Sequence, residues 1–174
     1  TFTGSGDGLV AIWYDQSGNS NNAAQATAAN QPKLVSSGVV ELDEGKPCLS
    51  YDTTGNDNLD FGTALTDVRS VFQVLRADGT GGFVNFLGAA NKSDYHSGNG
   101  KLLSNNYASA SVRNGANYIN SVLKNFTNTL KPTTQTLISM ISVSSTNNVS
   151  SIAKDRSNNG RSWKGKMQEA ILYN

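Results

Sequence analysis

The feature that most constrains the fold of this chain is an alternation of inward and outward residues with a period of two. Residues 70–76 (SVFQVLR) place Val71, Gln73 and Leu75 on one face of an extended strand. Residues 137–143 and 167–173 alternate in the same way. In the last of these segments the pattern predicts four side chains on one face: Met167, Glu169, Ile171 and Tyr173. Successive side chains of a β-strand point to opposite faces, so the pattern predicts strands with one buried face.

Five further short runs lie between Gly, Asn and Asp clusters and are strand candidates: residues 9–14, 39–42, 48–52, 59–61 and 82–87. The segment 155–162 contains Gly160 and predicts a hairpin loop. Residues 118–126 have helix-like apolar spacing that fits a strand and turn equally well, and residues 63–68 predict a short helical turn. The pattern therefore indicates an all-β fold, an antiparallel two-sheet sandwich with at most one or two short helices.

Composition narrows the classes of partner. The 174 residues fit one domain, here taken as residues 1–174. A net charge of +1 with 16% charged residues lacks the basic field that nucleic-acid binding requires. No apolar run approaches the roughly 20 residues of a membrane span, so no membrane insertion is expected. The chain opens on TFTGSGDG, without a signal peptide, as a fragment of a longer protein would.

The single cysteine, Cys48, excludes an internal disulfide and a multi-cysteine zinc site. It lies in an alternating stretch, KPCLSYD, and is predicted to be a small buried hydrophobe rather than a nucleophile.

Four segments occur in an order that resembles the laminin-G-like domains of the concanavalin A-like lectin/glucanase superfamily: residues 14–35, 45–62, 70–77 and 163–174. The resemblance implies a jelly-roll sandwich of the kind found in secreted bacterial proteins and in phage tail or structural proteins. It therefore implies a location that is extracellular, at the cell surface or on a virion. The YDQSG element also resembles part of the catalytic domain of fungal α-L-arabinofuranosidases. Two positions depart from the family pattern: Ser20 replaces a turn glycine, and Asn58 replaces a hairpin tyrosine.

The polar cluster after Tyr14 is interpreted as a turn rather than a ligand site. Asp, Ser and Asn side chains bond to the backbone of such turns, and glycine takes their positive-φ position. The predicted structural turn comprises Asp15, Gln16, Ser17, Gly18 and Asn19.

The acidic residues do not form a recognisable catalytic set. A glycosidase normally needs two carboxyl groups about 5–10 Å apart. In a strand, Glu41 and Asp43 would share one face while Glu44 would point away, and the following EGKP indicates a solvated turn. No catalytic residue is therefore assigned. Glu169 is predicted either to be buried with a hydrogen-bonding partner or to lie on a ligand-binding face of its sheet.

A bound Ca²⁺ is one option implied by the resemblance, because laminin-G-like domains often hold it at a loop rim. Four aspartates could supply oxygen ligands: Asp7, Asp15, Asp57 and Asp60. They do not have the spacing of an EF-hand loop, so the identity of any metal site stays open, and no other cofactor is indicated.

Carbohydrate recognition calls for an aromatic platform flanked by amide and carboxylate hydrogen-bonding groups. Two predicted loops have this content. The candidate binding residues are Asp94, Tyr95, His96, Asn99, Tyr107, Arg113, Asn114 and Tyr118.

These observations predict a non-catalytic adhesion module whose partner is a glycan or cell-surface polysaccharide. One alternative is a structural decoration or tail-fibre domain that is held by contacts with other virion or fibre subunits. Another is a fragment of an arabinofuranosidase-like glycoside hydrolase.

Overall fold

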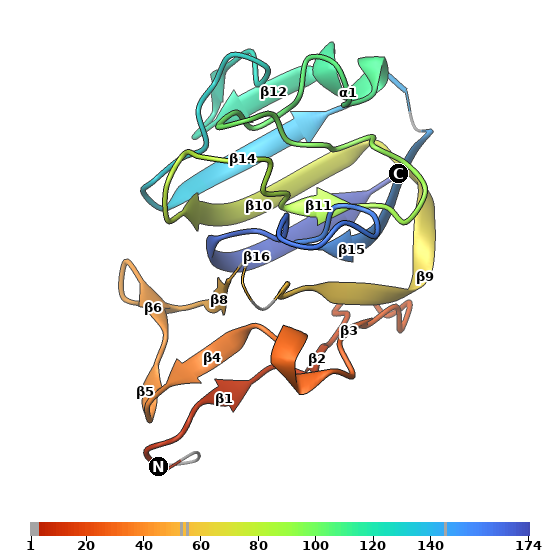
Figure 1. Cartoon of the computed structure of the whole chain (residues 1–174). Helices are drawn as coiled ribbons and strands as arrows, with labels where there is room; N and C mark the ends of the chain where they lie inside the picture. The colour runs from red at the N-terminus through yellow and green to blue at the C-terminus, as the bar shows by residue number, and fades with distance from the viewer. Residues whose placement is uncertain (1–3, 53, 55, 145) are drawn as a thin grey trace.

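The computed structural model describes residues 4–52, 54, 56–144 and 146–174 as an antiparallel β-sandwich (Figure 1). The helices in these residues are a 3-10 turn, η1 (Ala28–Asn30), and one short α-helix, α1 (Ala110–Arg113). The prediction of an all-β sandwich with at most one or two short helices is confirmed.

The larger sheet has nine strands. Its order is β1 (Gly8–Leu9), β4 (Lys33–Ser36), β8 (Leu49–Tyr51), β16 (Gly165–Tyr173), β10 (Ser70–Ala77), β14 (Thr136–Ile141), β12 (Ala116–Ile119) and β13 (Val122–Leu123). The ninth strand, β5 (Val39–Val40), pairs with β4. Figure 1 shows this sheet running from β1 near the N-terminus up to β12.

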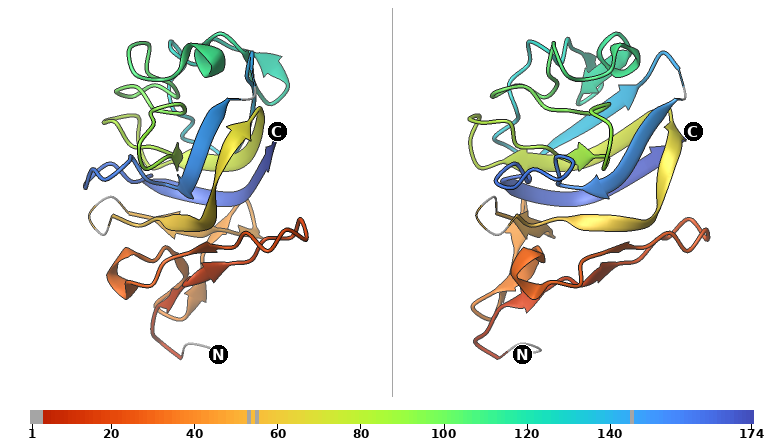
Figure 2. Two further views of the ribbon diagram at one scale, coloured as in Figure 1. Left: turned by 90° about the vertical axis from the view of Figure 1, so that its right-hand side faces the viewer. Right: turned by 45° about the vertical axis from the view of Figure 1, so that its right-hand side comes forward.

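The smaller sheet has five strands and lies across one face of the larger sheet, as Figure 2 shows. Its order is β11 (Leu87–Gly88), β15 (Asn147–Ile152), β9 (Leu59–Val68), β3 (Ala23–Ala24) and β2 (Ile12–Trp13). A separate hairpin consists of β6 (Leu42–Asp43) and β7 (Lys46–Pro47).

The alternation in the central strands is confirmed. In β10, Val71, Gln73 and Leu75 are buried, and the residues between them are half-buried on the other face. In β14, Ile138 and Met140 are buried, while the intervening residues face outward. Extended backbone with one apolar face is thus packed against the second layer, as period-two patterning requires.

The alternation predicted for the last strand is wrong. Val74 pairs with Glu169 and Leu75 pairs with Met167, so Gln168 is an extra residue on β16. Such a β-bulge moves the following side chains to the opposite face. Met167 is buried, but Glu169, Ile171 and Tyr173 point outward.

Two ambiguous or helical predictions become strands. Residues 63–68, predicted as a helical turn, belong to β9, where Leu65 pairs with Val149 and Val68 with Asn147. Pairing with β15 gives these residues backbone hydrogen bonds that one helical turn would not provide. Residues 118–126 contain the end of β12 and all of β13. The strand predicted for residues 82–87 is wrong except at its last residue, where β11 begins.

The core centres on Trp163, which is fully buried between the sheets. Its indole Nε1–H donates a hydrogen bond to the carbonyl oxygen of Arg76 at 3.1 Å, and its ring meets that of Phe86 edge-on at a centroid distance of 6.0 Å. Satisfying the indole N–H allows the ring to be buried without an unpaired donor. Trp163 is thus a packing residue of the core. Cys48 is buried as predicted, and burial raises the pKa of its thiol to about 11.

The loops that follow β10 are tied together by a buried lysine. Lys131 is 1% exposed, and its Nζ donates hydrogen bonds to the carbonyl oxygens of Gly82 at 3.0 Å and Gly98 at 2.9 Å. Burial lowers the pKa of this amine to about 8. The lysine thus joins the loop before β11 to the loop after it, which carries four candidate binding residues: Asp94, Tyr95, His96 and Asn99.

The segment after β2 is a hydrogen-bonded turn. Trp13 packs against the core, and Tyr14 is 63% exposed on the opposite side. The Asp15 carboxylate accepts hydrogen bonds from the backbone N–H groups of Ser17 at 2.8 Å and Asn21 at 2.9 Å, and the first of these bonds is the main cause that lowers its pKa. Ser17 accepts from Asn19, Gln16 donates to Tyr14, and Gly18 has a φ of +87°. Ser20 adopts a φ of +58° at the position where the family pattern has glycine.

No described helix is long and apolar enough to cross a bilayer.

Gly165→Ala tests the close approach of β16 to β10. A Cβ at Gly165, where φ is +142°, would lie 2.2 Å from the carbonyl oxygen of Arg76. We expect the free energy of unfolding in urea to fall by about 3 kcal/mol or more. The control is Gly18→Ala, where φ is +87° and no atom lies within 4 Å of the added Cβ. Strain alone should cost about 1 kcal/mol there. Equal losses in the two variants would contradict the steric explanation.

Candidate functional site

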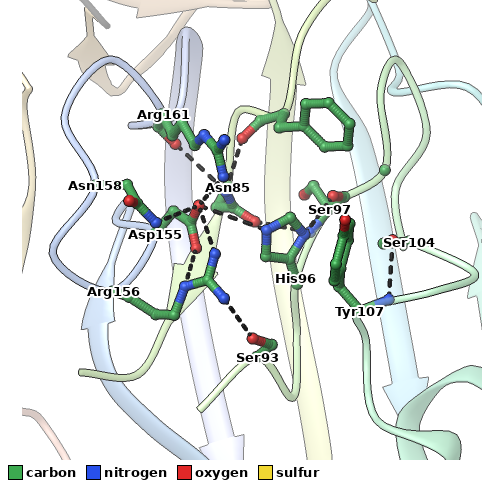
Figure 3. A network of polar contacts seen from close by, with 12 residues as sticks. Asn85, Ser93, His96, Ser97, Ser104, Tyr107, Asp155, Arg156, Asn158 and Arg161 are labelled. Carbon is green, nitrogen blue, oxygen red and sulfur yellow. Dashed lines mark hydrogen bonds and ion pairs between the residues drawn. The ribbon is translucent and has the colours of Figure 1, made fainter. Parts of the chain in front are cut away.

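A buried carboxylate organises the loop that joins β15 to β16. Asp155 is 3% exposed, and its oxygens contact Arg156 Nε at 3.1 Å, Arg161 Nη1 at 3.0 Å and His96 Nε2 at 3.4 Å. Figure 3 shows both guanidinium groups converging on this carboxylate from the same loop. Because a buried charge is costly unless it is paired, these contacts fix the shape of residues 155–161.

The protonation of Asp155 reflects two opposing effects. Burial alone would raise the pKa of the carboxyl group, but hydrogen bonds from His96 and Arg161, with the neighbouring positive charges, outweigh burial and lower the pKa to about 2. Asp155 is therefore ionised at neutral pH. We call the set Asp155, Arg156, Arg161 and His96 the Asp155 cluster.

His96 is held between two acceptors. Its Nδ1 lies 2.6 Å from the carbonyl oxygen of Ser97, and its Nε2 faces Asp155. Because a carbonyl oxygen only accepts, Nδ1 donates the hydrogen bond to Ser97. The ring of Tyr107 lies beside the imidazole at a centroid distance of 5.3 Å, and Tyr107 itself is 58% exposed (Figure 3). Of the predicted binding residues, the structure thus brings His96 and Tyr107 together.

The other predicted binding residues are dispersed and mostly serve the local structure. Asp94 Oδ2 accepts hydrogen bonds from the backbone and side-chain nitrogens of Asn148 at 2.7 and 3.1 Å. Tyr95 is 2% exposed and belongs to the core, where burial raises the pKa of its phenol to about 12. Asn99 Oδ1 accepts a hydrogen bond from the backbone N–H of Gly82 at 3.1 Å.

The last three predicted residues lie around α1 and β12. Arg113 donates to the carbonyl oxygen of Asn105 at 2.6 Å, and Asn114 is the C-cap of α1. Tyr118 lies in β12 and is partly exposed. None of the three contacts the Asp155 cluster through a hydrogen bond or ion pair recorded for the described residues.

A polar hollow lies on the other side of the 155–161 loop, and sequence analysis did not predict it. Its volume is about 240 Å³. The described lining residues are mostly amides and hydroxyls: Gln25, Asn30, Asn56, Asn58, Asp60, Lys154, Ser157, Asn158, Asn159 and Ser162. We call it the amide hollow.

The walls of the amide hollow come from three parts of the chain: residues 25–30, 56–60 and 154–162. Asn158 Nδ2 donates to Asp155 Oδ2 at 3.3 Å, so the Asp155 cluster also anchors one wall. Asn56 Oδ1 accepts a hydrogen bond from the backbone N–H of Gly160, which joins the loop before β9 to the same wall. Strand β9 supplies Asp60, whose two oxygens lie 3.0 and 2.8 Å from Lys154 Nζ.

One donor in the amide hollow lacks a partner among the described residues. Asn58 is 3% exposed; its Oδ1 accepts a hydrogen bond from Gln25 Nε2 at 3.0 Å, but its buried Nδ2 has no hydrogen-bond partner. A buried unpaired polar group costs about 1–3 kcal/mol, and this nitrogen is inaccessible to solvent. The only sequence signal was Asn58 itself, an amide in place of the hairpin tyrosine of the family pattern.

The acidic residues considered for catalysis are engaged in ion pairs. Glu41 Oε2 lies 2.9 Å from Lys166 Nζ, and Asp43 Oδ1 lies 2.8 Å from Arg76 Nε. Glu169 is exposed on the outer face of the larger sheet.

The four aspartates considered for calcium do not form one cluster. Asp7 pairs with Lys33 at 2.7 Å, a contact that lowers the pKa of Asp7, and Asp60 pairs with Lys154. Asp57 Oδ2 accepts from the backbone N–H of Asp52, and burial raises the pKa of Asp57 to about 6. Within the described ranges, no group of three His, Cys, Asp or Glu side chains is placed to hold a metal ion.

Comparison of the chain with protein-family models, with curated proteins and with solved structures finds no match. The candidate site therefore stands on its geometry alone.

Asp155→Asn tests the stabilising role of the cluster. The folded pKa of about 2 lies below the ordinary value of 3.8, so the ionised carboxylate stabilises the fold above pH 4, and this contribution is lost as the pH falls toward 2. The pKa difference corresponds to about 2 kcal/mol at pH 7. We expect the variant to lose about that much unfolding free energy at pH 7 in urea titrations.

The matched control is Asp67→Asn, which changes an exposed aspartate at the far end of β9 and should leave stability nearly unchanged. The difference in unfolding free energy between the wild type and Asp155→Asn should become smaller as the pH falls from 4 to 2. A gap that stays constant over this range would contradict the assignment of the stabilisation to the carboxylate charge.

Proposed function

We propose that this chain is a non-catalytic carbohydrate-binding module and that the amide hollow is its binding site. The observation that carries the proposal is the composition of this concave site, whose described lining residues are amides and hydroxyls around one carboxylate and one ammonium group. Sugar hydroxyl groups both accept and donate hydrogen bonds, so a wall of amides and hydroxyls with one carboxylate complements them. The resemblance to laminin-G-like domains favours the same function and an extracellular, cell-surface or virion location.

The Asp155 cluster supports the proposal by holding the hollow open in the absence of ligand. Ion pairs from Arg156 and Arg161 fix the backbone of the loop that bears Asn158. A site that is already formed avoids the entropy of ordering a loop on binding. Tyr107 is exposed beside His96, across the cluster from this loop (Figure 3).

Asn58→Leu tests this function. Leucine has a similar size but neither donates nor accepts, so it removes one amide from the wall and leaves Gln25 Nε2 without its acceptor. Binding should weaken about fivefold to tenfold. The assay is a glycan array on the wild-type chain, followed by calorimetric titration of the polysaccharides that bind. The control is Asn128→Leu, an exposed asparagine outside the hollow, with melting temperatures measured for all three proteins. Failure of the wild type to bind any of a diverse set of polysaccharides would overturn the proposal.

A second candidate function, assembly into a larger particle through protein contacts, is favoured by the outer face of the larger sheet. This face presents a row of apolar side chains that are exposed or half-buried: Phe72, Val74, Leu137, Ile141, Ile171 and Tyr173. Part of the row lines a hollow of about 230 Å³. Contiguous apolar surface of this kind is typical of protein interaction sites.

Leu137→Lys and Ile171→Lys test the second candidate in the form of self-assembly. We expect the wild type to sediment as an oligomer at tens of micromolar, and each variant to sediment as a monomer, because a lysine is costly to bury at an apolar interface. Val39→Lys, on the exposed strand β5, is the control and should leave the oligomer intact. A wild type that stays monomeric throughout this range would contradict self-assembly.

A further inference from the structure

The charge of the amide hollow is balanced. Among the described lining residues, Asp60 and Lys154 are the charged ones, and they pair with each other at 2.8 Å. The remaining described lining residues are amides and hydroxyls. An anionic ligand would meet the Asp60 carboxylate, and the one ammonium group that could compensate is already engaged. Electrostatics at this site therefore favours a neutral ligand.

The ion pair remains open to a ligand. The Asp60 side chain is 46% exposed and that of Lys154 is 34% exposed. Each carboxylate oxygen has further lone-pair sites, and the ammonium group has hydrogens beyond those used in the pair. The site thus offers strong acceptors at Asp60 next to the donors of Lys154. Two adjacent hydroxyl groups, one donating and one accepting, match this arrangement.

The size of the hollow limits how much of a glycan it can enclose. Its volume of about 240 Å³ lies below the range of roughly 300–1,000 Å³ that is usual for sites enclosing drug-sized ligands. One pyranose ring is the natural occupant. None of the described lining residues is aromatic, so the ring would be held by its hydroxyl groups rather than by stacking. Binding of one ring by hydrogen bonds in water should be weak, with a Kd on the order of millimolar.

We propose that the amide hollow selects a single neutral pyranose ring with two adjacent free hydroxyl groups, and that Asp60 and Lys154 reject acidic sugars such as uronates. This inference rests on the proposed carbohydrate-binding function and specifies its ligand class. Asp60 accepts from one hydroxyl, and the Lys154 ammonium group beside it donates to the neighbouring hydroxyl.

The experiment is a titration followed by ¹H–¹⁵N NMR, with two classes of probe. The neutral probes are the methyl glycosides of glucose, galactose and mannose, and the acidic probe is the methyl glycoside of glucuronic acid. At least one neutral probe should shift the amide signals of Asn58 and Gly160 with a Kd on the order of millimolar. The uronate should bind at least about tenfold more weakly.

Asp60→Asn reverses the selectivity if the inference is right. The variant keeps the size and an acceptor oxygen but leaves Lys154 unpaired, so the hollow gains a net charge of one. Affinity for the neutral probe should fall about tenfold with the loss of a charged acceptor, and affinity for the uronate should rise about tenfold. Asp67→Asn, on the same strand and outside the hollow, is the matched control and should change neither the affinity for the neutral probe nor that for the uronate. The exposed ion pair contributes little to folding, so the variant remains testable.

The outcomes separate this inference from the function on which it rests. If polysaccharides bind on the array but the probes shift signals outside the hollow, the inference is overturned and the function stands. The same result follows if neutral and acidic probes bind with equal affinity. The same holds if Asp60→Asn behaves like the Asp67→Asn control. Absence of binding both on the array and in the titration would overturn both.

Discussion

The position of β10 between β14 and β16 is the constraint on which the rest of the structure depends. It pairs along its length with both neighbours, and its inward side chains Val71, Gln73 and Leu75 lie against the second layer. The carbonyl oxygen of its Arg76 accepts the hydrogen bond of Trp163 and lies so close to Gly165 that a Cβ there would have no room. The start of β16 is thereby fixed, and with it the end of the 155–161 loop.

That loop links the fold to the candidate site. Asp155 is too deeply buried to remain charged without partners, and the two arginines that compensate it come from the loop itself. Satisfying one buried charge thus determines the backbone of seven residues, of which Ser157, Asn158 and Asn159 line the amide hollow. The cluster shapes the hollow, and the hollow contributes the groups that can meet a ligand. Under the proposed function, stability and binding would depend on different residues of one short segment.

Local patterns predicted the fold better than the site. Period-two alternation was sufficient for β10 and β14, because one buried face is a property of the strand itself. It failed in β16, where the extra residue Gln168 reverses the faces of the side chains that follow. A local helical signal failed at residues 63–68, which pair with β15 as part of β9. The prediction of the site residues failed for a related reason. Tyr95 was predicted as a loop aromatic but lies in the core. Asp60 and Lys154 come together at the hollow only because segments far apart in the sequence pack against each other. Nothing in a single sequence reports which polar side chain will be buried without a partner.

The extra residue at Gln168 has a consequence for tracing the ancestry of this chain. A related strand without the bulge would have the same inward and outward side chains but would lack the residue that corresponds to Gln168, so it would be one residue shorter. An alignment that lacks a gap at Gln168 would then match each outward residue of one protein after this point to an inward residue of the other. Substitution patterns there would look unconstrained even if both strands occupied the same place. Detecting distant relatives of this chain therefore depends on allowing a one-residue insertion inside a strand, where alignments usually penalise it most.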